Sequence, residues 1–156
     1  MKCDRHTENT GYSLLEVVLV MAILVTFAAI AIPRYAGAVV RHQADLAARR
    51  VVADLRQAQS FAKTQSASCT VSFTVATSKY QLIGVPSFDG NPGDYNVNLS
   101  HDPYDAKLVS AALGGDSQVV FDGWGTPDSG GTIVISSGSE QRTVIVDGDT
   151  GQVTIQ

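Results

Sequence analysis

Cysteine is scarce in this sequence of 156 residues, which contains only Cys3 and Cys69. A framework of several disulfides, as found in small secreted domains with little core, is therefore excluded. Cys69 stands in a stretch where apolar and polar residues alternate. That setting predicts a buried thiol that packs as a small hydrophobic side chain, rather than a nucleophile or a metal ligand.

Basic residues are scarce in the C-terminal part of the chain. Residues 64–156 hold three basic side chains against ten acidic ones, a net charge of −7, whereas residues 34–63 hold six basic and two acidic ones, a net charge of +4. A surface that binds nucleic acid needs clustered lysine and arginine, so we do not expect nucleic acid as a partner. The basic stretch fits a contact with another subunit or with lipid headgroups.

The length leaves no room for a second, catalytic domain. Single domains commonly take about 100 to 150 residues, which allows one domain and one membrane segment. Residues 128–131 include Ser129, but a serine nucleophile needs a histidine positioned by an acid, and the histidines stand in unrelated segments, at positions 6, 42 and 101. A turn between two strands explains this segment. We expect a protein that is not an enzyme and holds no cofactor.

The most unusual feature that is present is an apolar run near the N-terminus. Residues 1–11 are polar, and residues 12–32 are apolar apart from Ser13, Glu16 and Thr26. As a helix this run would measure about 32 Å, close to the hydrocarbon thickness of about 30 Å in a bilayer. It can therefore span a membrane as one segment.

Three interpretations of this run are open. A secretory signal peptide ends in a small-x-small cleavage site, which residues 29–31 and 36–38 both offer. A plain transmembrane anchor explains the length. Neither explains Glu16, because an ionised side chain in a membrane span costs about 2.5 to 3.5 kcal/mol at the centre, and such a residue indicates a function.

The third interpretation starts from the segment Gly11-Tyr12-Ser13-Leu14-Leu15-Glu16, which resembles the prepilin cleavage motif. The resemblance implies that residues 1–11 are a leader, that a prepilin peptidase/methyltransferase cuts after Gly11, and that Tyr12 becomes an N-methylated N-terminus. Glycine leaves the backbone unhindered for the peptidase. Tyr12 replaces the more common phenylalanine. Asp4 and Glu8 cancel the positive charge of the leader, so its cytoplasmic location also rests on the resemblance.

Glu16 has a role in this interpretation. It lies four residues, one helical turn, from the new amine of Tyr12, and it can neutralise an N-terminal ammonium, which in the family belongs to a neighbouring subunit. Pairing lowers the cost of burying the two charges in lipid. Pro33 ends the apolar run, as in many pilins, and a proline there kinks a helix. Glu16 and Pro33 are thus predicted to serve assembly, with other pilins or pseudopilins and membrane lipid as partners.

Residues 34–65 predict an amphipathic second half of the same helix. Apolar residues recur every three or four positions, at Val40, Ala44, Ala47, Val51, Leu55, Ala58 and Ala62. From Cys69 the period becomes two, which is typical of a half-buried strand. Strands are predicted at residues 69–75, 80–84, 118–121, 132–136, 142–146 and 152–155. Residues 85–106 are dense in Pro, Gly, Asn and Asp and predict a long connection or loop insertion.

This order of elements resembles the pilin fold, and in detail the GspH/FimT group of minor pseudopilins. The resemblance is carried by residues 55–60 with Ala62, residues 120–125 (Val-Phe-Asp-Gly-Trp-Gly), residues 142–146 and residues 151–153. It implies an α+β, pilin-like fold. In that fold a long N-terminal helix, transmembrane over residues 12–33 and kinked near Pro33, packs on a β-rich domain of antiparallel strands over residues 66–156.

The resemblance also implies a function. The chain is expected to be a structural minor pseudopilin that helps initiate or cap the type II secretion pseudopilus. It would cross the bacterial inner membrane once and place its globular domain in the periplasm. The alternative within the same architecture is a minor type IV pilin that serves pilus assembly or DNA uptake. An exported globular binding protein with an ordinary signal peptide is the alternative from another class.

Four aspartates are weak calcium candidates. Residues 122–127 resemble the calcium-binding loop of major pseudopilins, and carboxylate oxygens are available from Asp122, Asp128, Asp147 and Asp149. Calcium needs six to eight oxygen ligands. Acidic turns explain these residues better, so no bound metal is expected.

Overall fold

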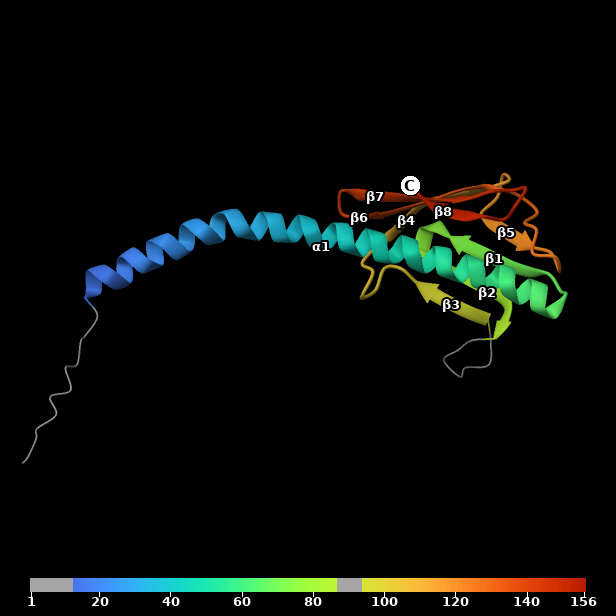
Figure 1. Cartoon of the computed structure of the whole chain (residues 1–156), viewed down its shortest axis with the longest axis horizontal. Helices are drawn as coiled ribbons and strands as arrows, with labels where there is room; N and C mark the ends of the chain where they lie inside the picture. Colours follow the sequence, from blue (N-terminus) through green and yellow to red (C-terminus); the bar gives the residue numbers. More distant parts are fainter. Residues whose placement is uncertain (1–12, 87–93) are drawn as a thin grey trace, which may run out of the picture. The chain divides into compact units, whose positions relative to one another are not determined.

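The computed structural model describes residues 13–86 and 94–156, without the side chains of residues 32, 33 and 94. The predicted cleavage site at Gly11 and Tyr12 therefore lies outside the described residues. The chain divides into two compact units, with the boundary after Gly37. A single helix, α1 (Leu14–Gln65), is assigned across this boundary (Figure 1).

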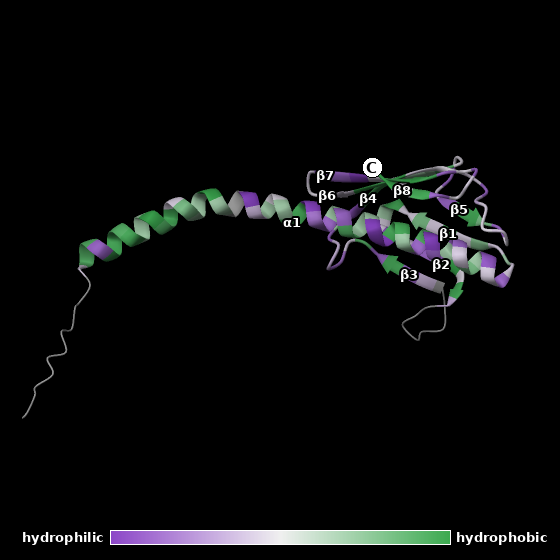
Figure 2. Cartoon of the chain, viewed as in Figure 1, coloured by the Kyte–Doolittle hydropathy of each residue, from purple (hydrophilic) through white to green (hydrophobic). Residues whose placement is uncertain are grey.

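The first unit is helical from Leu14 onward. The carbonyl oxygen of Ser13 accepts hydrogen bonds from the N–H groups of Glu16 and Val17, at 3.0 and 3.2 Å, and these bonds form the first turn. Every side chain from residue 13 to residue 31 is exposed, and the stretch is almost uniformly apolar (Figure 2). By length and composition α1 can cross a membrane. Exposed apolar side chains all round a helix suit a segment that is solvated by lipid or by other helices.

The backbone is assigned as helical through Pro33. The kink predicted there concerns how the two units are placed relative to each other, and it stays a prediction. Thr26 fits an apolar surrounding because its hydroxyl donates to the carbonyl oxygen of Ile23 at 2.7 Å. A hydroxyl satisfied within its own helix leaves no polar group to be buried unpaired in lipid.

In the described residues, the second unit combines the rest of α1 with eight strands in two antiparallel sheets. Sheet A has the order β3 (Asp94–Asn98), β2 (Lys79–Pro86), β1 (Cys69–Thr74), β5 (Gln118–Phe121). Sheet B has the order β4 (Lys107–Leu113), β6 (Gly131–Ser137), β7 (Glu140–Val146), β8 (Val153–Ile155). A short 3-10 helix, η1 (Val75–Thr77), joins β1 to β2.

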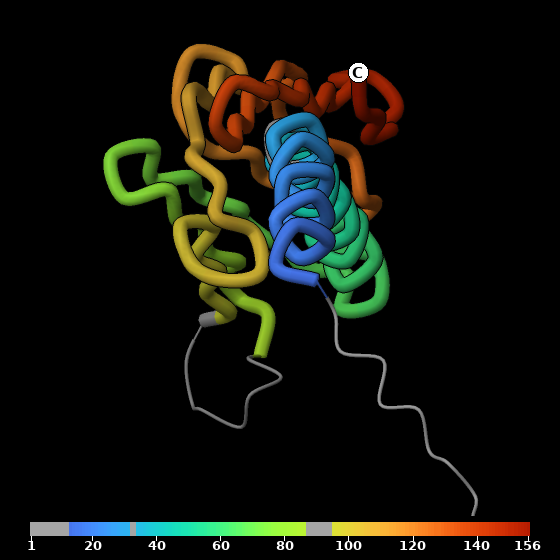
Figure 3. The backbone as a smooth tube through the Cα atoms, turned by 90° about the vertical axis from the view of Figure 1, so that its left-hand side faces the viewer, coloured from blue at the N-terminus to red at the C-terminus, as the bar shows by residue number. Residues whose placement is uncertain are grey.

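One face of α1 packs against both sheets, which lie on two sides of its second half (Figure 3). The helix residues on that face are fully buried and mostly small: Ala44, Ala47, Ala48, Val51, Leu55, Ala58 and Ala62. Small side chains let a helix approach strands closely, so the predicted apolar stripe became the centre of the core. The α+β, pilin-like architecture expected from the sequence is confirmed.

Two strands, β3 and β4, lie where the sequence predicts none. The stretch 85–106 was predicted as a connection, yet it contains the end of β2 and all of β3. β3 reads Asp-Tyr-Asn-Val-Asn, and its buried side chains are Tyr95 and Val97, so its polar positions resemble a turn. β4 reads Lys-Leu-Val-Ser-Ala-Ala-Leu, in which apolar and polar residues do not alternate, and its register shifts between Leu108 and Ser110. Such a bulge interrupts the period of two on which a strand prediction depends.

Cys69 opens β1 and is 1% exposed. Burial raises the pKa of its thiol above the ordinary value. Its place in the core confirms the prediction of a buried cysteine that packs as a hydrophobic side chain.

Candidate assembly site

Glu16 lies in the first turn of α1 and is exposed. A carboxylate suits this place because the unpaired N–H groups of the first turn carry partial positive charge. Val20 and Leu24 follow at four-residue intervals on the same side of the helix, and together with Val17 and Met21 they border one shallow groove. Glu16 is therefore a single acid on an otherwise apolar helix face.

The partner predicted for this acid cannot be placed in the same way, since Tyr12 lies outside the described residues, as does Gly11. The side chain of Pro33 is likewise not described. The structure thus fixes the helical setting of Glu16. Its pairing with an N-terminal amine stays a prediction.

Several of the residues that carry the resemblance to the GspH/FimT group contact one another near the C-terminal end of α1. Gln59 Nε2 donates to the carbonyl oxygen of Gly125 at 2.8 Å, and Arg56 Nη2 donates to the carbonyl oxygen of Val153 at 2.9 Å. Gly151 has a φ of +66°, and a Cβ atom there would lie 2.5 Å from Gln59 Nε2. These glycines are needed because the turns press directly on the helix. The motif therefore joins the helix to the β5–β6 turn and to β8.

The β5–β6 turn displays the single tryptophan of the chain. Asp122 Oδ1 accepts hydrogen bonds from the N–H groups of Trp124 and Thr126, at 2.9 and 2.8 Å, and a Cβ atom on Gly123 would lie 2.9 Å from the backbone of Ser66. The side chain of Trp124 is nevertheless 85% exposed. A rigid turn thus presents a large aromatic side chain to solvent.

The calcium candidates act as turn residues. Asp147 Oδ1 accepts hydrogen bonds from the N–H groups of Asp149 and Thr150, at 3.0 and 2.8 Å, and these bonds, with Thr150 contributing most, lower the pKa of Asp147. Asp128 Oδ1 accepts a bond from the N–H of Val120 at 2.9 Å. Within residues 13–86 and 94–156, no group of three or more His, Cys, Asp or Glu side chains is placed to hold a metal ion.

A buried polar cluster between α1 and sheet A was not found from the sequence. Asp54 is 3% exposed, and its Oδ2 atom accepts hydrogen bonds from Tyr80 Oη at 2.5 Å and from Arg50 Nε at 3.0 Å. The Arg50 guanidinium also lies 5.7 Å from the centre of the Tyr95 ring, a cation–π distance. One signal was available, namely an arginine four residues before an acid on a predicted helix.

Burial is the largest influence on Asp54 and raises the pKa of its carboxyl group, against the opposing effects of Tyr80 and Arg50. The pKa of Tyr80 is raised as well, by burial first and then by the charge of Asp54. This cluster ties β2 to the helix. It borders a second groove, between α1 and β3.

Comparisons with known proteins agree with this architecture. The family model described as "Type II transport protein GspH" matches residues 47–150. Crystal structures of the type IV minor pilin FimU of Pseudomonas aeruginosa (strain PAO1) have a similar fold in two crystal forms. One is 18% identical, with a TM-score of 0.50, and the match covers 74% of this chain and 90% of FimU. The other is 17% identical, with a TM-score of 0.50, and the match covers 72% of this chain and 91% of FimU. No curated protein sequence matches the chain.

Proposed function

This chain belongs to the GspH family of type II transport proteins, and we propose on that premise that it is a minor pseudopilin that helps initiate or cap the type II secretion pseudopilus. The observation that carries the proposal is a single chain that joins an exposed apolar helix bearing Glu16 to a GspH-type domain. The helix supplies filament packing, and the domain supplies contacts with other proteins. This role is structural and requires no catalysis.

The processing steps form part of the proposal. Residues 1–11 are removed by a prepilin peptidase after Gly11, Tyr12 is N-methylated, and residues 12–33 cross the inner membrane with the domain in the periplasm. Glu16 then pairs with the amine of an adjacent subunit as the helix leaves the lipid. The family membership and the apolar helix support these steps.

Mass spectrometry of the purified mature protein tests the processing. An N-terminal peptide that begins with methylated Tyr12 is expected. A mature chain that begins near residue 32 or residue 39 would show cleavage by an ordinary signal peptidase and would overturn the proposal.

Filament incorporation tests the role of Glu16. We expect Glu16→Ala to lower the amount of subunit in sheared, purified filaments by at least about tenfold, because one buried charge is left unpaired, at a cost of 1.4 kcal/mol or more. Thr26→Val is the matched control, since it changes a polar side chain of the same helix that is satisfied internally. Normal incorporation of Glu16→Ala would refute the charge-pairing mechanism.

A minor type IV pilin is the second candidate, favoured by the fold that this chain shares with FimU. Deletion of the gene separates the two. Loss of secreted enzymes with normal twitching and DNA uptake supports the pseudopilus. The opposite pattern supports the pilus.

A further inference from the structure

β8 is the last strand of sheet B, and among residues 13–86 and 94–156 it pairs only with β7. Thr143 and Gln156 exchange two hydrogen bonds, with N···O distances of 3.0 and 2.8 Å. In an antiparallel pair such bonded positions alternate with non-bonded ones, so the N–H and C=O groups of Ile155 point away from β7. The same alternation turns Val153 outward, and its carbonyl oxygen accepts the bond from Arg56. β8 therefore presents its free edge beside α1.

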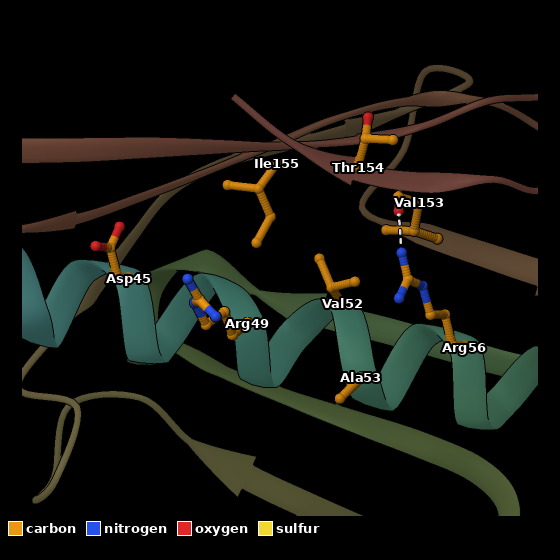
Figure 4. Close-up of a pocket in the computed structure, with 8 residues that line it drawn as sticks. All are labelled: Asp45, Arg49, Val52, Ala53, Arg56, Val153, Thr154 and Ile155. Carbon is orange, nitrogen blue, oxygen red and sulfur yellow. Dashed lines mark hydrogen bonds between the residues drawn. The ribbon is translucent and has the colours of Figure 1, made fainter.

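The space between this edge and α1 is a groove of about 570 Å³ (Figure 4). Its apolar part is formed by Val52, Val153 and Ile155, and Ile155 remains 39% exposed although it lies on the same side of the strand as the buried Val153. The side chain of Arg56 reaches from α1 to the strand, and Arg49 lies below Ile155 (Figure 4). The groove thus combines apolar surface, an open strand edge and two positive charges.

The two arginines differ from the other arginines around the sheet. In the described part of the chain, Arg142 bonds to Asp45 and Arg50 to Asp54, whereas neither Arg49 nor Arg56 has a carboxylate partner. They are seven residues apart on α1, so they share a face and are separated by about 10 Å along the helix axis. The lining also contains one acid, Asp45, which is paired with Arg142. Arg49 and Arg56 therefore leave the groove net positive, in a domain whose residues 64–156 carry a net charge of −7.

Two other sheet edges are covered by the chain itself. On β5, Val120 donates to Asp128 Oδ1 and accepts from the Asp128 N–H. On β4, the N–H of Leu108 donates to Ser78 Oγ at 3.1 Å. Natural proteins usually cover or charge their edges, because an open edge pairs with another strand. On β8 the Val153 carbonyl oxygen is already bonded to Arg56, so the open part of this edge is the N–H and C=O of Ile155. Lying beside the groove, these two groups are suited to a strand from outside.

We propose that an extended, acidic segment of a neighbouring pilin-like subunit binds in this groove and adds a strand to β8. Its backbone bonds to Ile155, its apolar side chains contact Val52 and Ile155, and one carboxylate lies between Arg49 and Arg56. This inference rests on the proposed function, which supplies the neighbouring subunit. A protein segment fits better than a phosphate-bearing partner, because the Ile155 carbonyl oxygen needs a donor, which a phosphodiester lacks.

Peptide binding to the full chain in mild detergent tests the proposal. Overlapping twelve-residue peptides cover the exported domains of the pilin-like subunits that are expressed together with this chain, and binding is followed by fluorescence anisotropy. At least one extended peptide with an acidic residue between apolar positions is expected to bind. Arg49→Gln should weaken it about tenfold, the effect of losing one charge-assisted contact. Lys79→Gln, which removes an exposed charge from sheet A, should leave binding unchanged.

A second pair of variants tests the strand pairing. Ile155→Pro removes an N–H that faces the groove and not β7, so sheet B keeps its bonds while the added strand loses one. Ile155→Val retains the N–H. We expect the proline variant to lose peptide binding at least tenfold and the valine variant to keep it, with equal resistance of both to urea.

Three results would overturn the proposal. The first is that no peptide binds, and the second is that Arg49→Gln and Ile155→Pro bind peptide as well as the unchanged chain does. The third is that a twelve-nucleotide oligothymidylate, or an anionic phosphatidylglycerol vesicle, competes with the peptide for the groove. Peptide binding does not require a filament. If no peptide binds but filament incorporation depends on Glu16 as expected, this inference alone is refuted. If a peptide binds as expected but incorporation does not depend on Glu16, the proposed function alone is refuted.

Discussion

Replacing Tyr80 with phenylalanine removes one hydroxyl group from the buried cluster between α1 and sheet A and leaves the ring in place. That hydroxyl donates to Asp54 Oδ2, and Asp54 is 3% exposed, so no water can easily take its place. A hydrogen bond to a charged group contributes about 1.5 to 3 kcal/mol. Asp54 keeps its bond from Arg50, and the ring keeps its packing, so we expect the free energy of unfolding to fall by about 2 kcal/mol.

The chain offers its own probe for this measurement. Cys69 is 1% exposed, and in a Cys3→Ser background it is the single thiol, so its reaction with a thiol reagent in increasing urea reports unfolding of the globular domain. Tyr35→Phe is the matched control, because Tyr35 is 74% exposed and should change the midpoint little. A double-mutant cycle with Asp54→Asn should give a coupling energy of about 1 kcal/mol.

Two outcomes would refute this reasoning. If Tyr80→Phe unfolds within about 0.5 kcal/mol of the unchanged chain, the size of an ordinary surface effect, the hydroxyl does not stabilise the buried carboxylate. If the coupling with Asp54→Asn is zero, the negative charge of Asp54 does not strengthen this hydrogen bond, because the amide oxygen of that variant can still accept from Tyr80 Oη.

Three further predictions use the same methods. Burial raises the pKa of Asp54 in the folded chain, so the contribution of this group to stability is fully present below its unfolded pKa of about 3.9 and is lost as pH rises through its folded pKa. The free energy of unfolding of the unchanged chain, minus that of Asp54→Asn, should therefore fall as pH rises from about 4. A difference that stays constant with pH would contradict the raised pKa. Gly131→Ala should destabilise the domain by at least about 2 kcal/mol, since a Cβ there overlaps the carbonyl oxygen of Ala112, whereas Gly37→Ala, with no atom within 4 Å of the new Cβ, should not. Gly11→Leu should leave residues 1–11 attached, which intact-mass measurement detects, and a normally shortened chain would exclude cleavage after Gly11.

The predictable parts of the fold were those with a clear period. The helix end at Gln65 and the strands β1 and β5 to β7 follow from spacing of apolar residues, because one buried face is enough to specify each. β3 and β4 have weak or shifted periods and depend on neighbours that the sequence does not reveal. Their positions come from tertiary pairing, which overrides local preference.

The candidate site shows a similar division. Glu16 is recognisable from sequence because an acid in an apolar run is rare. The structure places it in the first helical turn, and its role in assembly stays a prediction. Asp54 is not recognisable, since an acid near arginines on an amphipathic helix usually faces water. Its burial depends on Tyr80, which lies 26 residues away on β2. A groove such as that beside β8 depends in the same way on two distant segments.

The bond from Arg56 to Val153 joins residues that are 97 positions apart, and the pair of Arg142 with Asp45 is separated by the same interval. The last strands of the chain must therefore be in place before the second half of α1 can be enclosed, and in the proposed function this means that they must first cross the membrane. Until then the alanine face of α1 has no cover. Under the proposed function, folding of the domain would be tied to completed export, and a subunit truncated or stalled in transit would expose that face to chaperones and proteases instead of reaching the filament.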